Sequence, residues 1–191
     1  MYGIEQAVKE ASRSGKILSP IVSKTDKYKY WKSIESPTRC LECKEMHGKI
    51  YLKDEKPKPS PVLHPNGKCV IEKLNTIKVG TATCEKNNGA DRVLLEEGKL
   101  PDYYITKDEA KKDGWKKGDN LERIMKGKMI MGGEYKNCDG HLPTKPGRVW
   151  YEADINYYNG KRNKQRIVWS NDGLIFVTYD HYETFYLIEE D

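Results

Sequence analysis

The sequence predicts an α+β protein in which short helices pack on a four- to five-stranded antiparallel sheet, preceded by a small module that contains cysteine and histidine. Three observations carry this prediction. Helical patterns lie before residue 127, alternating β-branched and aromatic runs lie after residue 148, and four of the five cysteines lie before residue 90. Helices that precede a series of short strands are typical of α+β domains, where they cover one side of the sheet.

The chain divides by composition into a basic N-terminal part and a slightly acidic C-terminal part. Residues 1–90 carry 17 Lys and Arg against 10 Asp and Glu, whereas residues 91–191 carry 17 against 19. We therefore expect a basic adaptor over residues 1–75, a linker over 76–89 and a folded domain over 90–191. The excess positive charge lies outside that last domain, and a solvated lysine-rich surface explains it as well as a binding function does.

No run of the sequence approaches the ~20 consecutive apolar residues of a membrane helix, so we expect no membrane partner. The N-terminus also lacks the charged stretch and the apolar core that mark a signal peptide. If the protein is exported, the sequence does not show the route.

The N-terminal part contains little sequence of the kind that builds a core. Residues 4–14 have the apolar spacing of a helix, which should end before Gly15. Residues 39–70 are short apolar pieces between Pro, Gly and Lys, and the prolines of 56–61 exclude a helix or a central strand there. A bound metal would supply the stability that such a segment lacks.

Cysteine and histidine in this part have the spacing of a metal site. Cys40 and Cys43 form a Cys-x-x-Cys pair, and His64 and Cys69 stand at the ends of the segment His-Pro-Asn-Gly-Lys-Cys. Three thiolates and one imidazole are a tetrahedral ligand set for zinc. We therefore expect a structural zinc ion on these four residues. The alternative is that they are free buried thiols and an ordinary loop histidine.

Residues 28–72 resemble the C-terminal tail of phage head-morphogenesis proteins. The resemblance rests on Cys-x-x-x-x-Gly-Lys-Ile-Tyr at 43–51 and on His-Pro-Asn at 64–66. Those proteins usually have a cysteine where Gly67 stands, so the fourth ligand is the least secure, and Cys84 or His47 could take its place. We interpret the module as a structural adaptor that attaches or delivers the domain behind it.

Three short helices are expected at the start of the C-terminal part. Residues 90–97 have helical spacing and end at Gly98. Thr106 and Glu109 form a capping box for a second helix, which should end near Gly114. Asn120 is placed to cap a third helix that ends near residue 127.

The hydrophobic period changes from helical to strand-like after residue 148. Residues 148–156, 166–170, 174–179 and 184–188 are rich in β-branched and aromatic side chains. Asn-Gly at 159–160 and Asn-Asp-Gly at 171–173 separate them, and such sequences are typical of hairpin turns. We expect these strands to form an antiparallel meander.

Four residues of the meander have side chains suited to acid–base chemistry. Glu152 lies inside the first expected strand, Arg162 and Arg166 lie on or near the second, and His181 follows the third. Neighbouring antiparallel strands can bring such side chains onto one face. Taken alone, however, each is more often a solvated surface residue or a structural histidine. Spacing by itself therefore does not establish a site.

Residues 100–188 resemble the barnase-type, guanyl-preferring bacterial ribonucleases. The matching short segments include Leu-Pro-Asp at 100–102, Tyr-Ile-Thr-Lys at 104–107, Gly-Trp at 114–115, Glu-Ala-Asp-Ile-Asn-Tyr at 152–157, Arg-Asn at 162–163, Arg-Ile at 166–167 and Asp-His-Tyr at 180–182. The run at 152–157, followed at matching distances by both arginines and by Asp-His-Tyr, is highly specific. The resemblance implies the microbial ribonuclease fold.

The resemblance implies an endonuclease that cleaves single-stranded RNA without a catalytic metal or other cofactor. Glu152 corresponds to the general base, which takes the 2′-hydroxyl proton so that this oxygen attacks phosphorus and forms a 2′,3′-cyclic phosphate. His181 corresponds to the general acid, and the two exchange roles when water hydrolyses the cyclic phosphate. By the same correspondence, the cations around the phosphate and the residue that lies against the substrate are Lys107, Arg162, Arg166 and Tyr182.

The guanine-recognition loop of the family corresponds to the segment from Glu134 to Leu142. In this chain the segment lacks the family's arginine, and Asp139 stands where the family has a base-binding glutamate. We expect Glu134 and Asp139 to contact the substrate, and the base preference stays open.

Two functional interpretations follow from these residues. The first is a bacterial toxin, secreted or delivered, that has RNA as its substrate and a small acidic inhibitor of the barstar kind as its partner, because the family implies such an inhibitor. The alternative is a non-catalytic RNA- or phage-capsid-binding protein that uses the same fold. The complete catalytic set favours the first.

Overall fold

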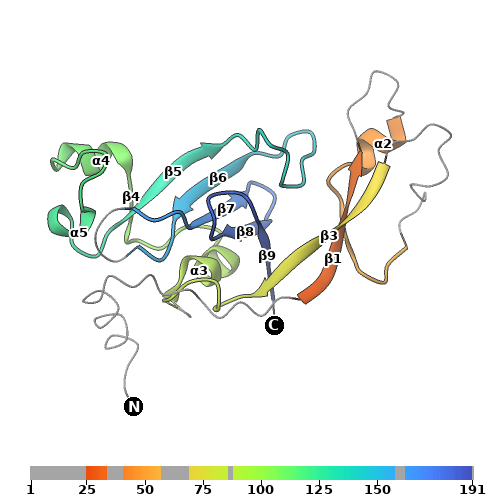
Figure 1. Cartoon of the computed structure of the whole chain (residues 1–191), viewed down its shortest axis with the longest axis horizontal. Coiled ribbons are helices and arrows are strands. Elements are labelled where there is room, and N and C mark those ends of the chain that lie inside the picture. Colours follow the sequence, from red (N-terminus) through yellow and green to blue (C-terminus); the bar gives the residue numbers. More distant parts are fainter. Residues whose placement is uncertain (1–24, 34–40, 57–68, 86–87, 158–161, 191) are drawn as a thin grey trace, which may run out of the picture.

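The structure is a computed structural model that describes residues 25–33, 41–56, 69–85, 88–157 and 162–190. One mixed sheet runs through the described residues, with strand order β2-β1-β3-β9-β8-β7-β6-β5-β4 (Figure 1). In chain order the elements are β1 Thr25–Ser33, α2 Leu41–Met46, β2 Ile50–Leu52, β3 Cys69–Lys78, α3 Ala90–Glu97, β4 Tyr104–Thr106, α4 Lys107–Lys112, α5 Leu121–Ile124, β5 Met129–Tyr135, β6 Trp150–Asp154, β7 Arg166–Ser170, β8 Ile175–Thr178 and β9 Tyr186–Glu189.

The three helices predicted for the C-terminal part are confirmed, and their caps explain their ends. α3 ends at Gly98, whose φ of 71° is left-handed. The Thr106 hydroxyl accepts from the Glu109 N–H at 3.1 Å, and the Glu109 carboxylate accepts from the Thr106 N–H at 2.7 Å, which is the predicted capping box of α4. Asn120 caps α5 by accepting from the Glu122 N–H at 3.0 Å. The helix expected at 4–14 lies outside the described residues.

The antiparallel meander is also confirmed. β6, β7, β8 and β9 pair antiparallel in sequence order. Two further strands extend this side of the sheet, since β5 pairs antiparallel with β6 and β4 pairs parallel with β5. The turn at 171–173 connects β7 to β8, with Gly173 at a φ of 92°, whereas the Asn-Gly pair at 159–160 lies outside the described residues.

The prediction of four to five antiparallel strands was wrong for the sheet as a whole, because within the described residues the sheet has nine strands and two of their pairings are parallel. β1 pairs antiparallel with both β2 and β3, and β3 pairs parallel with β9. β9 would otherwise be the edge of the meander, with unpaired N–H and C=O groups that β3 satisfies. The N-terminal strands therefore continue the sheet, and they carry α2 at their far end (Figure 1).

Residues 76–83, which we expected to belong to a linker, pack into the core. Ile77 and Ala82 are completely buried in an apolar cluster with α3 and the meander. The Asp91 carboxylate of α3 accepts from the N–H groups of Gly80 and Ala82 at 2.7 and 3.2 Å, and from the Thr83 hydroxyl at 2.9 Å. This segment is therefore held against α3.

The sheet carries an apolar cluster on each face. One cluster joins α3 to alternate residues of β6, β7 and β8, and the other contains Trp150 and Val168. Successive residues of a strand point to opposite faces, so Glu152 and Asp154 share the face of Trp150. The candidate residues of β6 therefore lie on the face opposite α3. Within the described residues, none of the helices has the length and apolar character that a membrane span requires.

A partly buried ion pair joins the turn after β7 to the segment before β6. The Arg148 guanidinium donates to the Asp172 carboxylate from Nε and from Nη2, each at 2.9 Å, and the Lys145 Nζ lies 2.6 Å from the same carboxylate. Burial raises the pKa of Asp172, but hydrogen bonds from Arg148, Lys145 and Ser170 outweigh this effect and hold its pKa well below the ordinary value. The ionised form of Asp172 therefore stabilises the fold.

We expect Asp172→Asn to lower the free energy of unfolding at pH 7 by about 1–3 kcal/mol, because it removes hydrogen bonds between charged groups. A depressed pKa stabilises the folded state above the unfolded pKa of about 3.9 and loses this effect as the pH falls toward the folded pKa. Denaturant unfolding of both proteins should show a gap that shrinks below about pH 4. Asp108→Asn, which removes an exposed pair with Lys111, is the control and should change little. A gap of equal size at pH 7 and at pH 3 would contradict this assignment.

Candidate active site

Glu152 lies in the middle of β6, opposite Val168 of β7, and its side chain is partly exposed. The neighbouring strand β5 has a bulge at this point, because its register passes from Met131 opposite Ala153 to Glu134 opposite Tyr151. Gly132 lies in this bulge and faces the carboxylate, since a Cβ built on Gly132 would lie 2.5 Å from Glu152 Cγ. A glycine in the bulge therefore leaves the space that the Glu152 side chain fills.

Asp154, two residues after Glu152 on the same face of β6, holds both predicted arginines. Its buried carboxylate accepts from Arg162 Nε at 2.5 Å and Nη2 at 2.6 Å, and Arg166 Nε lies 3.0 Å away. The hydrogen bond to Asp154 is the main cause that raises the pKa of Arg162, against the opposing effect of burial. Asp154 is not among the site residues predicted from the sequence, although a second carboxylate at the i+2 position of a strand marks a shared face.

Arg166 is fixed by its own loop as well as by Asp154. It stands directly opposite Asp154 in the register of β6 and β7. Its Nη1 donates to the carbonyls of Asn163 and Gln165 at 2.8 and 2.6 Å, and the side chain is only 8% exposed. The guanidinium is thus held in one orientation before any anion binds, which is what preorganised electrostatic stabilisation requires.

The loop between β8 and β9 presents His181 from an unusual backbone conformation. His181 and Tyr182 have φ values of 68° and 74°, in the left-handed region that non-glycine residues seldom adopt. The Thr178 hydroxyl accepts from the Tyr182 N–H and donates to the Asp180 carboxylate, which accepts from the Thr184 N–H, each at 2.9 Å. These hydrogen bonds hold the loop in its strained backbone conformation, and strain that is maintained by surrounding contacts is typical of functional loops.

Tyr182 brings the strand carboxylate and the loop imidazole together. Its hydroxyl donates to Glu152 Oε2 at 2.5 Å, and its ring lies 4.8 Å from the ring of His181. Burial raises the pKa of Tyr182, the Glu152 carboxylate raises it further, and Arg166 opposes both effects. Glu152, His181 and Arg166 therefore meet around one phenol, on the same side of the sheet.

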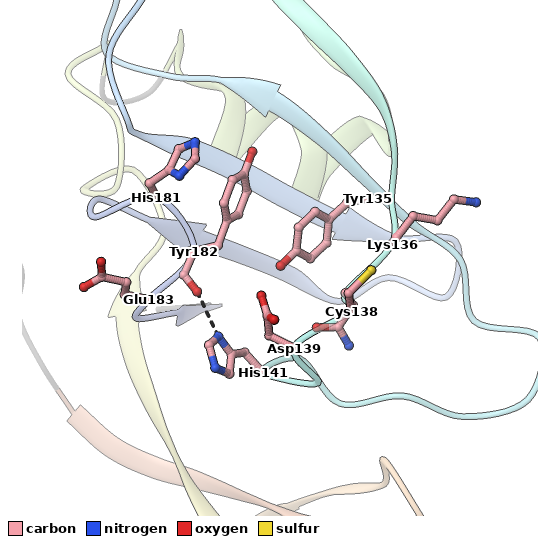
Figure 2. A pocket seen from close by; sticks show the side chains of 9 residues that line it. Tyr135, Lys136, Cys138, Asp139, His141, His181, Tyr182 and Glu183 are labelled. Carbon is pink, nitrogen blue, oxygen red and sulfur yellow. Dashed lines mark hydrogen bonds between the residues drawn. The ribbon is translucent and has the colours of Figure 1, made fainter.

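A pocket of about 470 Å³ opens beside His181 (Figure 2). Two loops form its walls, residues 181–183 on one side and residues from Tyr135 to His141 on the other. The rings of Tyr135 and Tyr182 stack at 5.0 Å with 17° between their planes. Burial and the nearby charges of Asp139 and Glu152 raise the pKa of Tyr135 to about 12. Aromatic faces next to a carboxylate are suited to a flat ring that carries N–H donors.

The remaining predicted substrate residues are placed less centrally. Asp139 lines the pocket, but Glu134 is not among the described residues that line it and instead pairs with Lys136 at 2.7 Å. Lys107 begins α4 directly after β4, and β4 lies two strands from β6. Two inter-strand steps correspond to roughly 10 Å. Lys107 is therefore separated from Glu152 by the whole width of β5.

Only two of the four predicted zinc ligands can be placed. Cys40 and His64 lie outside the described residues, whereas Cys43 Sγ and Cys69 Sγ are 3.0 Å apart. In the part of the chain that the structure describes, no group of three or more His, Cys, Asp and Glu side chains could hold a metal ion. The structure thus supports a close pair of thiols that links α2 to β3.

The structure describes both alternative fourth ligands, His47 and Cys84. His47 binds the Ser33 N–H through Nδ1 at 3.0 Å and the Thr144 hydroxyl through Nε2 at 2.8 Å. Cys84 lies beyond the other end of β3, a strand of ten residues and roughly 30 Å that begins at Cys69. Cys84 is therefore far from the thiol pair, whereas both ring nitrogens of His47 are engaged in hydrogen bonds.

The C-terminal half of the chain, which contains the candidate active site, is similar to known proteins. The model of a protein family described as ribonuclease matches residues 89–189. A ribonuclease of Heyndrickxia coagulans is 48% identical over 100 residues, which are 51% of this chain and 91% of that protein. Ribonucleases of Bacillus intermedius and Bacillus pumilus are also 48% identical over 100 residues, and the match spans 61% of the length of each. The matched family region contains the whole cluster around Tyr182 and none of the strands β1, β2 and β3.

Proposed function

The chain belongs to the ribonuclease family, and from this membership we propose that it is an endoribonuclease whose catalytic centre is the cluster around Tyr182. One observation carries the proposal: Tyr182 contacts both Glu152 and His181, beside an arginine that a buried carboxylate holds in place. A base, an acid and fixed cations are the groups that cleavage of a phosphodiester requires.

In the proposed first step, Glu152 takes the proton of the 2′-hydroxyl. The 2′-oxygen attacks the adjacent phosphorus, the bond from phosphorus to the 5′-oxygen breaks, and His181 gives a proton to that leaving oxygen. The products are a 2′,3′-cyclic phosphate and a 5′-hydroxyl end. In the second step His181 takes a proton from water, whose oxygen bonds to phosphorus. The bond from phosphorus to the 2′-oxygen breaks, Glu152 returns a proton to that oxygen, and the product is a 3′-phosphate. DNA has no 2′-hydroxyl and is not a substrate.

Arg162 and Arg166 are the proposed partners of the scissile phosphate, and Lys107 is proposed as a further cation. Two guanidinium groups with the Asp154 carboxylate between them leave one net positive charge beside the phosphate. Charges act strongly only within about a Debye length, roughly 10 Å, so this cluster operates despite the acidic balance of the domain. We propose that these cations carry out the charge stabilisation and that cleavage needs no metal.

The proposed occupant of the pocket is the nucleobase. The stacked rings of Tyr135 and Tyr182 offer an aromatic face, and Asp139 offers a carboxylate from the facing loop (Figure 2). A carboxylate can accept from both N1–H and N2–H of guanine. Aspartate has a shorter arm than glutamate, so this contact requires a closer approach of the loop.

We propose a bacterial toxin, secreted or delivered, as the biological role. An N-terminal module lies outside the matched family region, and a toxin whose nuclease is delivered needs such an attached module. A partly buried cationic site that binds phosphate is also complementary to an acidic surface, which supports a small acidic inhibitor of the barstar kind as a partner.

For the N-terminal module we propose a structural zinc ion on Cys40, Cys43, His64 and Cys69. The approach of Cys43 Sγ to Cys69 Sγ within 3.0 Å supports two of these ligands. Mass spectrometry of the native protein, purified under reducing conditions, should find about one zinc per chain. Cys69→Ser should lose the metal, and an apo protein with the same melting temperature would contradict the proposal.

Incubation of the purified protein with single-stranded RNA in excess chelator tests the enzymatic function. We expect cleavage to continue, because the proposed centre uses only side chains, and we expect His181→Ala purified in parallel to be inactive. Binding of RNA without cleavage would favour the non-catalytic alternative. Loss of cleavage while circular dichroism shows an intact fold would exclude the metal-independent mechanism.

A further inference from the structure

The N-terminal module, of which the structure describes β1, α2, β2 and β3, packs against the chain segment that directly follows the pocket loop. We define the pocket loop as residues 135–142 and the docking segment as residues 143–148. Arg148 of the docking segment donates from Nη1 to the Gly48 carbonyl at 3.4 Å. Gly48 itself lies so close that a Cβ on it would be 2.1 Å from the Thr144 carbonyl oxygen, and its φ of 78° also requires glycine. The fit between module and segment is therefore tight.

His47 is the polar link between the two parts. Its Nδ1 accepts from the Ser33 N–H at 3.0 Å, at the end of β1. Because that nitrogen is the acceptor, the neutral ring carries its proton on Nε2, which donates to the Thr144 hydroxyl at 2.8 Å. The position of Thr144 is thus fixed relative to the N-terminal strands.

The C-terminal end of the pocket loop, at Leu142, packs against the same module. The Asn137 side chain closes the loop by donating to the Leu142 carbonyl at 2.9 Å and accepting from its N–H at 3.0 Å. Leu142 is 1% exposed and belongs to the apolar cluster that includes Tyr30 of β1 and Leu74 of β3. The N-terminal strands are therefore connected to the pocket loop by an apolar contact at Leu142 and to the adjoining docking segment by a polar contact at Thr144.

The pocket loop in turn contacts the loop that carries the proposed acid. His141, the neighbour of Leu142, forms a hydrogen bond through Nδ1 with the backbone carbonyl of Tyr182 at 2.9 Å (Figure 2). A displacement of the docking segment would therefore move one wall of the pocket relative to Tyr182.

We propose that the N-terminal module is a brace for the nucleobase pocket, in which His47 and Thr144 are positioning residues. The inference rests on the proposed function, which supplies the ligand of the pocket. A preformed pocket binds its ligand more tightly, because the free energy of ordering the loop is not subtracted on binding. The brace therefore acts on KM and on nucleotide affinity, while the acid and base that set kcat remain in place.

His47→Ala and Thr144→Val remove the same hydrogen bond from its two sides. We expect each to raise KM for RNA, and Kd for guanosine 3′-monophosphate measured by calorimetry, about threefold to tenfold, as the loss of one hydrogen bond predicts. We expect kcat to stay within about twofold. His47→Ala also loses the bond from the Ser33 N–H, so we expect the double variant to show no larger effect than His47→Ala alone.

Glu55→Ala is the matched control. It removes the hydrogen bond that the Glu55 carboxylate accepts from the Leu52 N–H at 3.3 Å, inside the same module but outside the apolar cluster that contains Leu142. An unchanged KM in His47→Ala and Thr144→Val would overturn the brace, and so would an equal rise in Glu55→Ala, which would indicate general loosening. If the wild-type protein does not cleave RNA, the proposed function fails, and the nucleotide affinities of the same variants still decide whether the module shapes the pocket.

Discussion

His181→Gln and Glu152→Gln should each lower kcat/KM for RNA by about 10²–10⁴-fold, because each removes one partner of general acid–base catalysis. Neither side chain is buried, so we expect the folded state to persist in both variants. Initial rates on a fluorogenic oligoribonucleotide measure the effect.

The pH dependence of the residual activity separates the two roles. The wild-type rate should rise and then fall with pH, because cleavage needs Glu152 ionised and His181 protonated. Glu152→Gln should lose the dependence on the acidic side and His181→Gln the dependence on the alkaline side. Tyr151→Phe is the control, since Tyr151 precedes Glu152 in β6 but points to the opposite face. A His181→Gln variant with near wild-type activity would exclude this residue as the acid.

Asp154→Asn should have the largest effect on stability and also reduce activity. The change removes the carboxylate that pairs with two guanidinium groups, which are 23% and 8% exposed. Removing one partner of a buried ion pair typically costs about 3–5 kcal/mol, because the charge left behind is uncompensated. Denaturant unfolding measures this loss, and Asp102→Asn, at an exposed position, is the control.

A second substitution distinguishes the structural from the catalytic role of Asp154. The double variant Asp154→Asn with Arg162→Met lacks one of the unpaired cations, so it should regain part of the stability that Asp154→Asn loses. It should regain no activity, because a proposed phosphate ligand is also gone. Recovery of both properties together would show that Arg162 takes no part in catalysis.

The elements that were predicted from the sequence are those with local signals. Thr106 with Glu109 and Asn120 specify helix starts through contacts within four residues, and the meander has turn residues and period-2 strands. β3 was missed because it pairs with β9, more than 100 residues away in sequence, and β1 was missed because it pairs with β3 and β2 and not with a neighbour across a short turn. β4 has only three residues and a parallel partner, which leaves no hairpin signal.

Some residues of the candidate site were predicted from the sequence, and others only the structure shows. Short sequence motifs shared with the ribonuclease family identified Glu152, Arg162, Arg166 and His181. Asp154 lies inside one of these motifs but was given no role. Its function follows from register, because Asp154 stands opposite Arg166 only when β6 and β7 pair as they do. Two further contacts join segments that are distant in sequence: the stacking of Tyr135 on Tyr182 and the hydrogen bond between His47 and Thr144. No local sequence pattern predicts them.

Chemical analysis of the RNA ends formed early in the reaction, in excess chelator, tests most directly whether Glu152 and His181 act on one phosphodiester. We predict 2′,3′-cyclic phosphate and 5′-hydroxyl ends, with 3′-phosphate ends appearing later. Products that carry 5′-phosphate and 3′-hydroxyl ends would contradict attack by the 2′-oxygen and with it the proposed roles of both residues.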